Sequence, residues 1–463
     1  MIGIFKAASR LIRSRWLALF ACGIAIGLLE VELVRNAGVA WAQESSNVAS
    51  SETTEGGANK PLTFAEREAL FAEIRRIGGT VDVSRFQDTD VIAIGLEGPK
   101  VTDAIVSRLT GLDNVRRLSL INDVKITDAA LESVGILTSL QDLRIMGDIS
   151  DAGLAYLGEL KELQVFLISN SPRITSAGLE TLCDLPKLTI IRVTGHLLTD
   201  DALRLLSGSK SLTTLDIESQ GITDAGLVHV ARMKSLRDLS LSSNRITDAG
   251  LVHIARMKSL RDLALSSNRI TTAGLQTLKN GPPLESIGLG GYQINDTCLQ
   301  VLGQMPALKS ISLGEAAVTD EGLKHLSGLK QLESLYLGNT RVRGEGLKHL
   351  RAPLKQFSLT GTDVDDSACA HLHQFPQLLN VALGTGTTDP RFKVKITDEG
   401  LKALAKATSI RSLTLGGTFV TDVGIAYLAV IPELRLTVGV SPAVTDAGIK
   451  WLNDSSNVHA ERY

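Results

Sequence analysis

Five histidines occupy one repeated position of the sequence, and histidine is a common metal ligand. They stand two residues after the leucine position of a recurring Thr-Asp-x-Gly-Leu motif: His229, His253, His325, His349 and His371. A zinc site needs three or four ligands converging at about 2 Å. Equivalent positions of successive repeats instead lie several ångströms apart on a diverging surface, and no cysteine or carboxylate recurs beside them. The pattern therefore favours a solvated helix face over a metal site.

A second cluster of possible ligands lies between residues 363 and 373. It contains Asp363, Asp365, Asp366, His371 and His373. Asp365 and Asp366 stand where most other repeats carry Thr and Asp, the position from which a short polar side chain caps a helix. We therefore interpret this cluster as helix capping, not as metal binding.

Neither the cysteines nor a search for catalytic motifs indicates an active site. Cys183, Cys298 and Cys369 take the alanine, glycine and first leucine positions of their repeats, which predicts small buried side chains and no disulfide. The sequence has no HExxH, P-loop or GxSxG motif, and the GTGTT stretch at 384–388 lacks the lysine of a phosphate loop. We expect no enzyme activity, no cofactor and no metal.

A fixed period organises the residues around these positions. ITDAGLVHVARMKSLRDLSLSSNR (222–245) is followed at once by ITDAGLVHIARMKSLRDLALSSNR (246–269), and the two copies differ at two positions. The Thr-Asp pair or a relative begins fifteen units, at Thr102, Thr127, Ser150, Thr175, Thr199, Thr223, Thr247, Thr271, Asn295, Thr319, Arg343, Asp365, Thr397, Thr421 and Thr445. Such a period of about 24 residues is typical of repeat architectures.

Each unit changes its apolar period halfway. Leu251, Ile254 and Ala255 fall at the i, i+3, i+4 spacing of an amphipathic helix, and the LxxLxL run at 260–265 ends in the alternation of a short strand. Thr247 is expected to cap the helix, and Asp248 suits the positive end of the helix dipole. The sequence therefore predicts strand, turn and helix in every unit, with Gly250 allowing a close approach to its neighbours.

One unit cannot bury both its helix stripe and its strand face, so neighbouring units must stack on a shared core. The unit LxxLxLxx(N/T)x(I/V)TDxGLxxLA resembles the leucine-rich repeats of the ribonuclease-inhibitor and F-box-LRR type, and IRRIGGTVDVS at 74–84 followed by VTDA resembles secreted leucine-rich-repeat proteins of planctomycete-type bacteria. The resemblance covers roughly residues 62–463. It implies an α/β fold, a right-handed solenoid with parallel strands on the concave face and helices on the convex face.

Composition is consistent with one elongated repeat domain. The 463 residues are 44% hydrophobic but only 4% aromatic, as in a core of aliphatic side chains. A net charge of −2 gives no general attraction to nucleic acid or to an anionic membrane. We therefore expect no nucleic-acid partner, and membrane contact only through the N-terminal segment.

Residues 1–42 have the layout of a secretory signal peptide. Basic residues precede the apolar run WLALFACGIAIGLL at 16–29, and AWA at 40–42 offers a cleavage site before Gln43. Two alternatives remain: an uncleaved membrane anchor formed by residues 16–29, and a lipid attached to Cys22. We expect an exported protein, periplasmic, on the cell surface or secreted.

The remaining boundaries follow from composition. Residues 43–60 are rich in Ser, Thr, Glu and Gly and predict a disordered linker. Residues 61–90 predict a capping helix and lead-in, because TFAE at 63–66 matches a capping box for a helix through about Ile77. Residues 91–463 form the repeat domain, which ends in an atypical repeat.

The repeat register predicts which residues face the concave surface. The first half combines charged residues with apolar ones and resembles an interface with an apolar anchor and a charged rim; the second half is lined by Gly and Ser. The candidate binding residues are Arg144, Met146, Phe166, Ile168, Arg192, Asp216, Glu218 and Tyr336. Ordinary exposed strand residues selected for solubility are the alternative.

A longer loop gives a second candidate. GTGTTDPRFKVK at 384–395 carries Phe392 between basic residues and adds to the usual period. Loops on a rigid scaffold often carry function, although they also tolerate insertions.

The sequence thus predicts a noncatalytic, monomeric, exported scaffold that binds another protein through its concave face. A structural cell-envelope protein without one specific partner is an alternative, supported by the near-identical repeats. A substrate-recognition subunit of the F-box-LRR kind is another, although no F-box-like helical segment precedes the repeats.

Overall fold

The computed structural model describes residues 61–86, 89–384, 394–439 and 441–462. They belong to one compact unit, Asn59–Tyr463. The predicted signal peptide (1–42) and linker (43–60) lie outside the described residues, as does Phe392. No helix in the described ranges is both long and apolar enough to span a membrane.

The described part of the chain forms a single sheet of seventeen strands. The strands are β1 (Thr80–Phe86), β2 (Thr89–Glu97), β3 (Val115–Ile121), β4 (Asp142–Met146), β5 (Val165–Ser169), β6 (Ile190–Thr194), β7 (Thr214–Glu218), β8 (Asp238–Ser240), β9 (Asp262–Ala264), β10 (Ser286–Gly290), β11 (Ser310–Gly314), β12 (Ser334–Tyr336), β13 (Gln356–Thr360), β14 (Asn380–Gly384), β15 (Ser412–Gly416), β16 (Arg435–Val438) and β17 (His459–Arg462).

Helices alternate with these strands. They are α2 (Phe64–Arg76), α3 (Asp103–Ser107), α4 (Asp128–Val134), α5 (Asp151–Ala155), α6 (Glu180–Cys183), α7 (Asp200–Leu206), α8 (Asp224–Val230), α9 (Leu251–Ile254), α10 (Thr272–Leu278), α11 (Asp296–Leu302), α12 (Asp320–Leu323), α13 (Asp366–His371), α14 (Asp398–Leu404), α15 (Asp422–Ala426) and α16 (Asp446–Ser455). Short 3-10 turns extend several of them or replace the helix, as at Glu345–His349.

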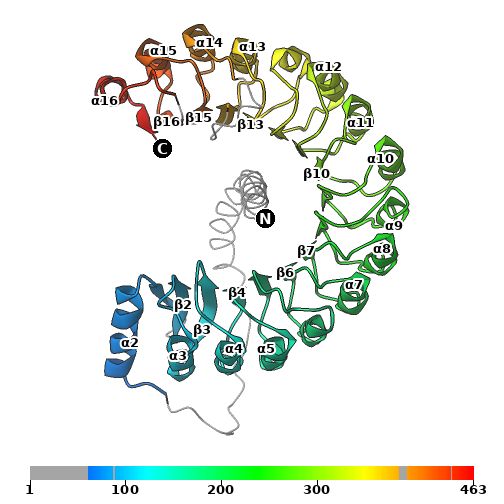
Figure 1. Ribbon diagram of the computed structural model, residues 1–463, viewed down its shortest axis with the longest axis vertical. Helices are drawn as coiled ribbons and strands as arrows, with labels where there is room; N and C mark the ends of the chain where they lie inside the picture. The colour runs from blue at the N-terminus through cyan, green and yellow to red at the C-terminus, as the bar shows by residue number, and fades with distance from the viewer. Residues whose placement is uncertain (1–60, 87–88, 385–393, 440, 463) are drawn as a thin grey trace, which may run out of the picture. The chain divides into compact units, whose positions relative to one another are not determined.

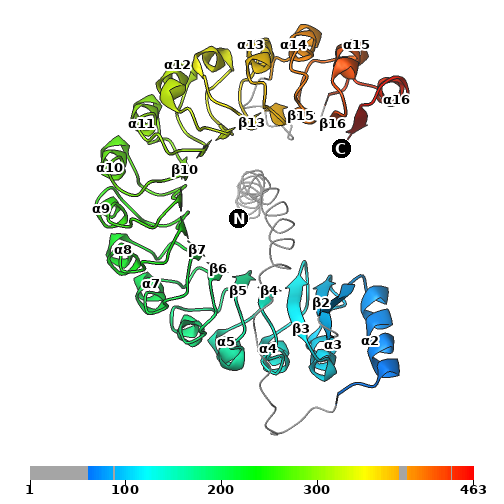
Figure 2. The same ribbon diagram turned by 180° about the vertical axis from the view of Figure 1, so that it is seen from behind.

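Consecutive strands pair in chain order, from β2 to β17 in parallel. Within the unit, the strands line the inner side of a curved array and the helices its outer side (Figure 1), and the view from behind shows the same two layers (Figure 2). The sheet does not close on itself. The predicted leucine-rich-repeat solenoid, with parallel strands inside and helices outside, is confirmed.

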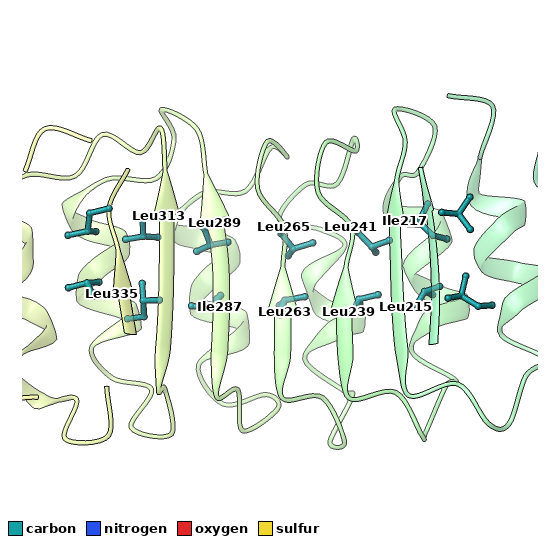
Figure 3. Close-up of a cluster of buried hydrophobic side chains, with 14 of the residues drawn as sticks. Leu215, Ile217, Leu239, Leu241, Leu263, Leu265, Ile287, Leu289, Leu313 and Leu335 are labelled. Carbon is teal, nitrogen blue, oxygen red and sulfur yellow. The ribbon is translucent and has the colours of Figure 1, made fainter. Parts of the chain in front are cut away.

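The core lies between the two layers and continues from repeat to repeat. Figure 3 shows two rows of aliphatic side chains, one from each leucine position of the strand motif, including the pairs Leu239/Leu241 and Leu263/Leu265. These four side chains are at most 2% exposed. At about 25 cal/mol per Å² of buried apolar surface, this shared core is what holds otherwise short helices and strands in place.

The Thr-Asp pair links neighbouring repeats. Thr247 Oγ accepts a hydrogen bond from Ala249 N–H (3.3 Å) in the turn before α9. The helix itself begins later, with Gly250 at its N-cap, so the cap predicted at Thr247 is wrong, whereas Thr223 makes the equivalent bond at the N-cap of α8. Asp224 of the preceding repeat accepts two further bonds, from Thr247 N–H (2.8 Å) and Thr247 Oγ–H (2.6 Å). The same pair of hydrogen bonds recurs at most junctions. The aspartate therefore joins two repeats in addition to lying near a helix start.

The glycine of the motif is required by this aspartate. A Cβ on Gly250 would lie 2.4 Å from Asp224 Oδ1, and a Cβ on Gly424 would lie 2.1 Å from Asp398 Oδ1. The close approach predicted for Gly250 is therefore confirmed, and its neighbour is a carboxylate. A larger side chain would push the aspartate off its two donors.

The N-terminal end has a cap. Thr63 and Glu66 form the predicted capping box at the start of α2, and the helix buries Leu70, Phe71 and Ile74. The sequence did not reveal that β1 then pairs antiparallel with β2.

Candidate functional site

Strand residues on the concave face alternate with core residues. In β6 and β7 the second and fourth residues are buried, whereas the first, third and fifth are half-buried. Because successive side chains of a strand point to opposite faces, the half-buried set lies on the side away from the helices. Parallel register then aligns these residues in rows across the array.

The structure places most of the predicted binding residues on this concave face. The half-buried ones are Arg144 and Met146 on β4, Arg192 on β6, Asp216 and Glu218 on β7, and Tyr336 on β12. Their predicted placement is confirmed.

Phe166 and Ile168 were wrongly predicted to face a partner. Both belong to the core, with 0% and 2% exposure. Phe166 is in register with Leu143 on one side and Ile191 on the other, so it fills the first leucine position of β5. The predicted register was one residue off in this repeat, which exchanges the two faces of a strand.

Correcting the register reveals an apolar patch that the sequence reading missed. Val165, Leu167 and Ser169 are the half-buried residues of β5, and the first two are apolar. Val165 is in register with Ile190 of β6, and Met146 and Ile121 lie on the same face of β4 and β3. We call these five residues, Ile121, Met146, Val165, Leu167 and Ile190, the apolar patch. Counting Phe166 as the leucine position would have found it.

Arginines border the apolar patch on both sides. Leu167 is in register with Arg144 on β4 and with Arg192 on β6. Arg144 Nε lies 3.0 Å from Asp142 Oδ1, and Arg117 Nε lies 3.3 Å from Asp142 Oδ2, where Asp142 is only 8% exposed. These ion pairs hold the guanidinium groups beside the patch, so they need little reordering when a partner arrives.

The next strands carry an acidic strip, which we define as Asp216, Glu218, Asp238 and Asp262. Arg192 Nε lies 2.8 Å from Asp216 Oδ2, so the strip begins where the arginine rim ends. Asp238 and Asp262 are directly in register on β8 and β9. Burial, and next the hydrogen bond and repulsion from Asp238, raise the pKa of Asp262 to about 7. The two carboxyl groups therefore share a proton below neutral pH.

The second half of the concave face is lined by small residues, as predicted. They are small because the neighbouring strands leave no room for larger side chains. Gly290 and Gly384 are buried, and a Cβ on either would lie 2.6 Å or less from the carbonyl oxygen of the next strand. Tyr336 donates its hydroxyl hydrogen bond to Gln356 one strand away. Here the residues serve strand packing.

The histidines and acidic cluster take the places expected from the repeat. Asp365 caps α13, and Asp366 accepts hydrogen bonds from Thr397 N–H (2.8 Å) and Oγ–H (2.7 Å). His371 faces Glu345 at 3.4 Å. Across the described ranges, no three His, Cys, Asp or Glu side chains are grouped as a metal site would require.

The cysteines in the repeats are free thiols. Cys298 and Cys369 are buried as predicted, whereas Cys183 is half-buried. Burial raises the pKa of the Cys183 thiol to about 11 and raises that of Cys369 as well. Both remain protonated at neutral pH, which makes them poor nucleophiles.

One segment of the chain matches a known protein family. Residues 210–270 match the family model described as Leucine rich repeat. No curated protein matches the sequence. Among solved structures, an internalin of Listeria monocytogenes is similar at 20% identity and a TM-score of 0.40, covering 80% of this chain and 93% of that one. A leucine-rich-repeat protein of Leptospira interrogans is similar at 19% identity and a TM-score of 0.41, covering 77% and 97%. At these values neither bears on what this chain binds.

Proposed function

We propose that this leucine-rich-repeat chain is a noncatalytic, exported scaffold that binds another protein through the first half of its concave face. The observation that carries the proposal is the apolar patch between two arginines, Leu167 flanked by Arg144 and Arg192. Protein interfaces typically surround such an apolar centre with a polar rim, and arginine is enriched among the residues that dominate binding.

The surrounding geometry supports binding over chemistry. Arg117 and Arg144 pair with Asp142, Arg192 pairs with Asp216, and Asp238 and Asp262 share a proton, so most charged groups of this face are held by one another. The face is also long and open, which suits a polypeptide better than a small molecule.

Quantitative affinity capture with the full-length chain as bait tests this function. A partner should be retained by the parent chain and recovered about tenfold less or worse with Leu167→Asp, because a charge at the centre of an interface must be desolvated. Thr414→Asp is the matched control, since Thr414 is a half-buried residue at the same strand position of β15. Equal recovery on all three baits would favour the structural envelope protein instead.

Export rests on the segment 1–42 and is tested separately. Amino-terminal sequencing of the protein isolated from its cells should begin at Gln43. A chain that begins at residue 1 or 2 and partitions with membranes would support the uncleaved anchor.

A further inference from the structure

We infer that the partner is a polypeptide that places an apolar side chain on the apolar patch and a lysine or arginine on the neighbouring acidic strip. This inference rests on the proposed function and adds the chemistry of the partner. It follows from two features that lie side by side on one face.

The first feature is the apolar anchor point. Leu167, Val165 and Ile190 are adjacent half-buried side chains on β5 and β6. They sit on the face opposite the core and stay half-buried in the described part of the chain. A single aliphatic or aromatic side chain of a partner would cover them.

The second feature is the negative charge of Glu218, Asp238 and Asp262 on the acidic strip. In the described ranges Glu218, Asp238 and Asp262 form no ion pair with Lys, Arg or His, whereas Asp216 is paired with Arg192. Thr214 donates a hydrogen bond to Asp238 (2.7 Å), and Ser286 donates one to Asp262. Hydroxyl groups reduce the repulsion between these carboxylates but do not cancel their charge.

Repulsion between the carboxylates of the acidic strip contributes to the raised pKa of Asp262. The raised pKa of Asp262 reflects burial, the adjacent Asp238 and the more distant Glu285, which itself pairs with Lys309 and faces Arg261. An ammonium or guanidinium group from a partner would stabilise the ionised pair. A partner without such a group would leave the carboxylates less solvated and still repelling each other.

The strand spacing fixes the distance between the two contacts. Leu167 on β5 and Asp238 on β8 are three strands apart, which is about 14 Å at roughly 4.8 Å per strand. A chain crossing the strands in an extended conformation covers that distance in about four residues. The expected partner segment therefore has an apolar residue about four positions from a lysine or arginine.

A random dodecapeptide phage library selected on the full-length chain at pH 7.5 and low salt tests the inference. Enriched peptides should carry that spacing. The consensus peptide should bind about tenfold more weakly or worse to Leu167→Asp and to the double variant Asp238→Asn/Asp262→Asn, but normally to Thr414→Asp. If Leu167→Asp unfolds early in a thermal melt, Leu167→Ala takes its place.

The outcomes separate the inference from the function. Enriched peptides that depend on Leu167 but tolerate the double asparagine variant, or that lack basic residues, would overturn the inference and leave the concave-face function standing. Enriched peptides insensitive to all of these substitutions, or an absence of enrichment, would count against both. Weaker peptide binding by both Leu167→Asp and the double asparagine variant, together with a peptide affinity that falls as salt is added, would support the inference.

Discussion

Asp262 and Asp238 make the stability of the central repeats depend on pH. The pKa of Asp262 rises from 3.8 to about 7 in the folded chain, so the folded state holds a proton that the unfolded state releases. Its stabilising contribution is complete below about pH 4 and is lost as the pH rises through 7. We expect Asp262→Asn to be more stable than the parent at pH 8 by about 1 kcal/mol, discounted for partial solvent exposure, and nearly equal at pH 4.

Thermal melts of parent and variant at both pH values check this prediction. Asp238→Asn should behave in the same way, because removing either carboxylate relieves the pair. Glu132→Gln is the control, since Glu132 is exposed on α4. A variant that lost stability equally at pH 4 and pH 8 would show that the pair does not share a proton.

Truncation of two neighbouring residues of β5 should cost very different amounts of stability. Phe166 is fully buried, and we expect Phe166→Ala to lower the unfolding free energy by about 3–5 kcal/mol. Leu167 is half-buried on the other face, so Leu167→Ala should cost about 1 kcal/mol or less. Denaturant unfolding measures both, and equal losses would contradict the strand register described above.

At the scale of the element, the residue after each Thr and the glycine of the next repeat are matched in size. Ser176, Thr272 and Gly344 replace the aspartate at three junctions, and the next glycine position then holds a larger residue, Ala202, Cys298 or Ala368. Where the aspartate is present, glycine follows at all but one junction of the described chain, the exception being Asp103 with Ala130. The two positions compensate because they fill one space.

This size matching predicts non-additive substitutions. Gly250→Ala should cost about 1–3 kcal/mol, because its Cβ would meet Asp224 Oδ1. Adding Asp224→Ser reproduces the natural pair Ser176/Ala202, in which Ser176 Oγ accepts the Thr199 N–H bond at 3.0 Å. The double variant should lose about 1 kcal/mol less than the sum of the single ones in denaturant unfolding.

A glycine in a distant repeat provides the control for this double-mutant cycle. Gly322 belongs to a repeat far from Asp224, so Asp224→Ser combined with Gly322→Ala should be additive. Additivity in the neighbouring pair as well would mean that the two positions do not share one space.

For the whole molecule, junctions without the aspartate should open first. In a stacked array stability is a sum of repeats and their interfaces, so weak interfaces divide it into separately opening segments. The backbone N–H groups of Thr247 and Thr319 each donate a hydrogen bond to the aspartate of the preceding repeat (both 2.8 Å). Asn295 occupies the same position, but the preceding repeat carries Thr272 in place of the aspartate, so in the described chain the Asn295 N–H has no carboxylate acceptor. We expect peptides spanning 293–297 to exchange hydrogen about tenfold faster than those spanning 317–321.

Hydrogen exchange followed by mass spectrometry measures this difference. Restoring the motif with Thr272→Asp, Cys298→Gly and Asn295→Thr should slow exchange at 293–297 to the level of its neighbours. Exchange that is uniform along the array, or unchanged in the restored variant, would show that the aspartate does not set the strength of a junction.

The period and the chemistry of the Thr-Asp-Gly-Leu motif were enough to predict the solenoid, its parallel strands and the capping box at Thr63. These features are local, because helix caps and apolar spacing act within a few residues. The faces of β4, β6 and β7 also followed from the sequence. In β5 two apolar residues, Val165 and Phe166, compete for the same place, and the sequence alone did not distinguish them.

The sequence by itself determined the repeat, the position of most capping residues and the absence of the known catalytic motifs. Only the tertiary structure decided which apolar residue of β5 enters the core, which carboxylates meet across β8 and β9, and why glycine follows aspartate from one repeat to the next. Each of these depends on contacts between residues about 24 positions apart. The physical reason is that stacking fixes such neighbours in space, whereas a single repeat contains only one member of each pair.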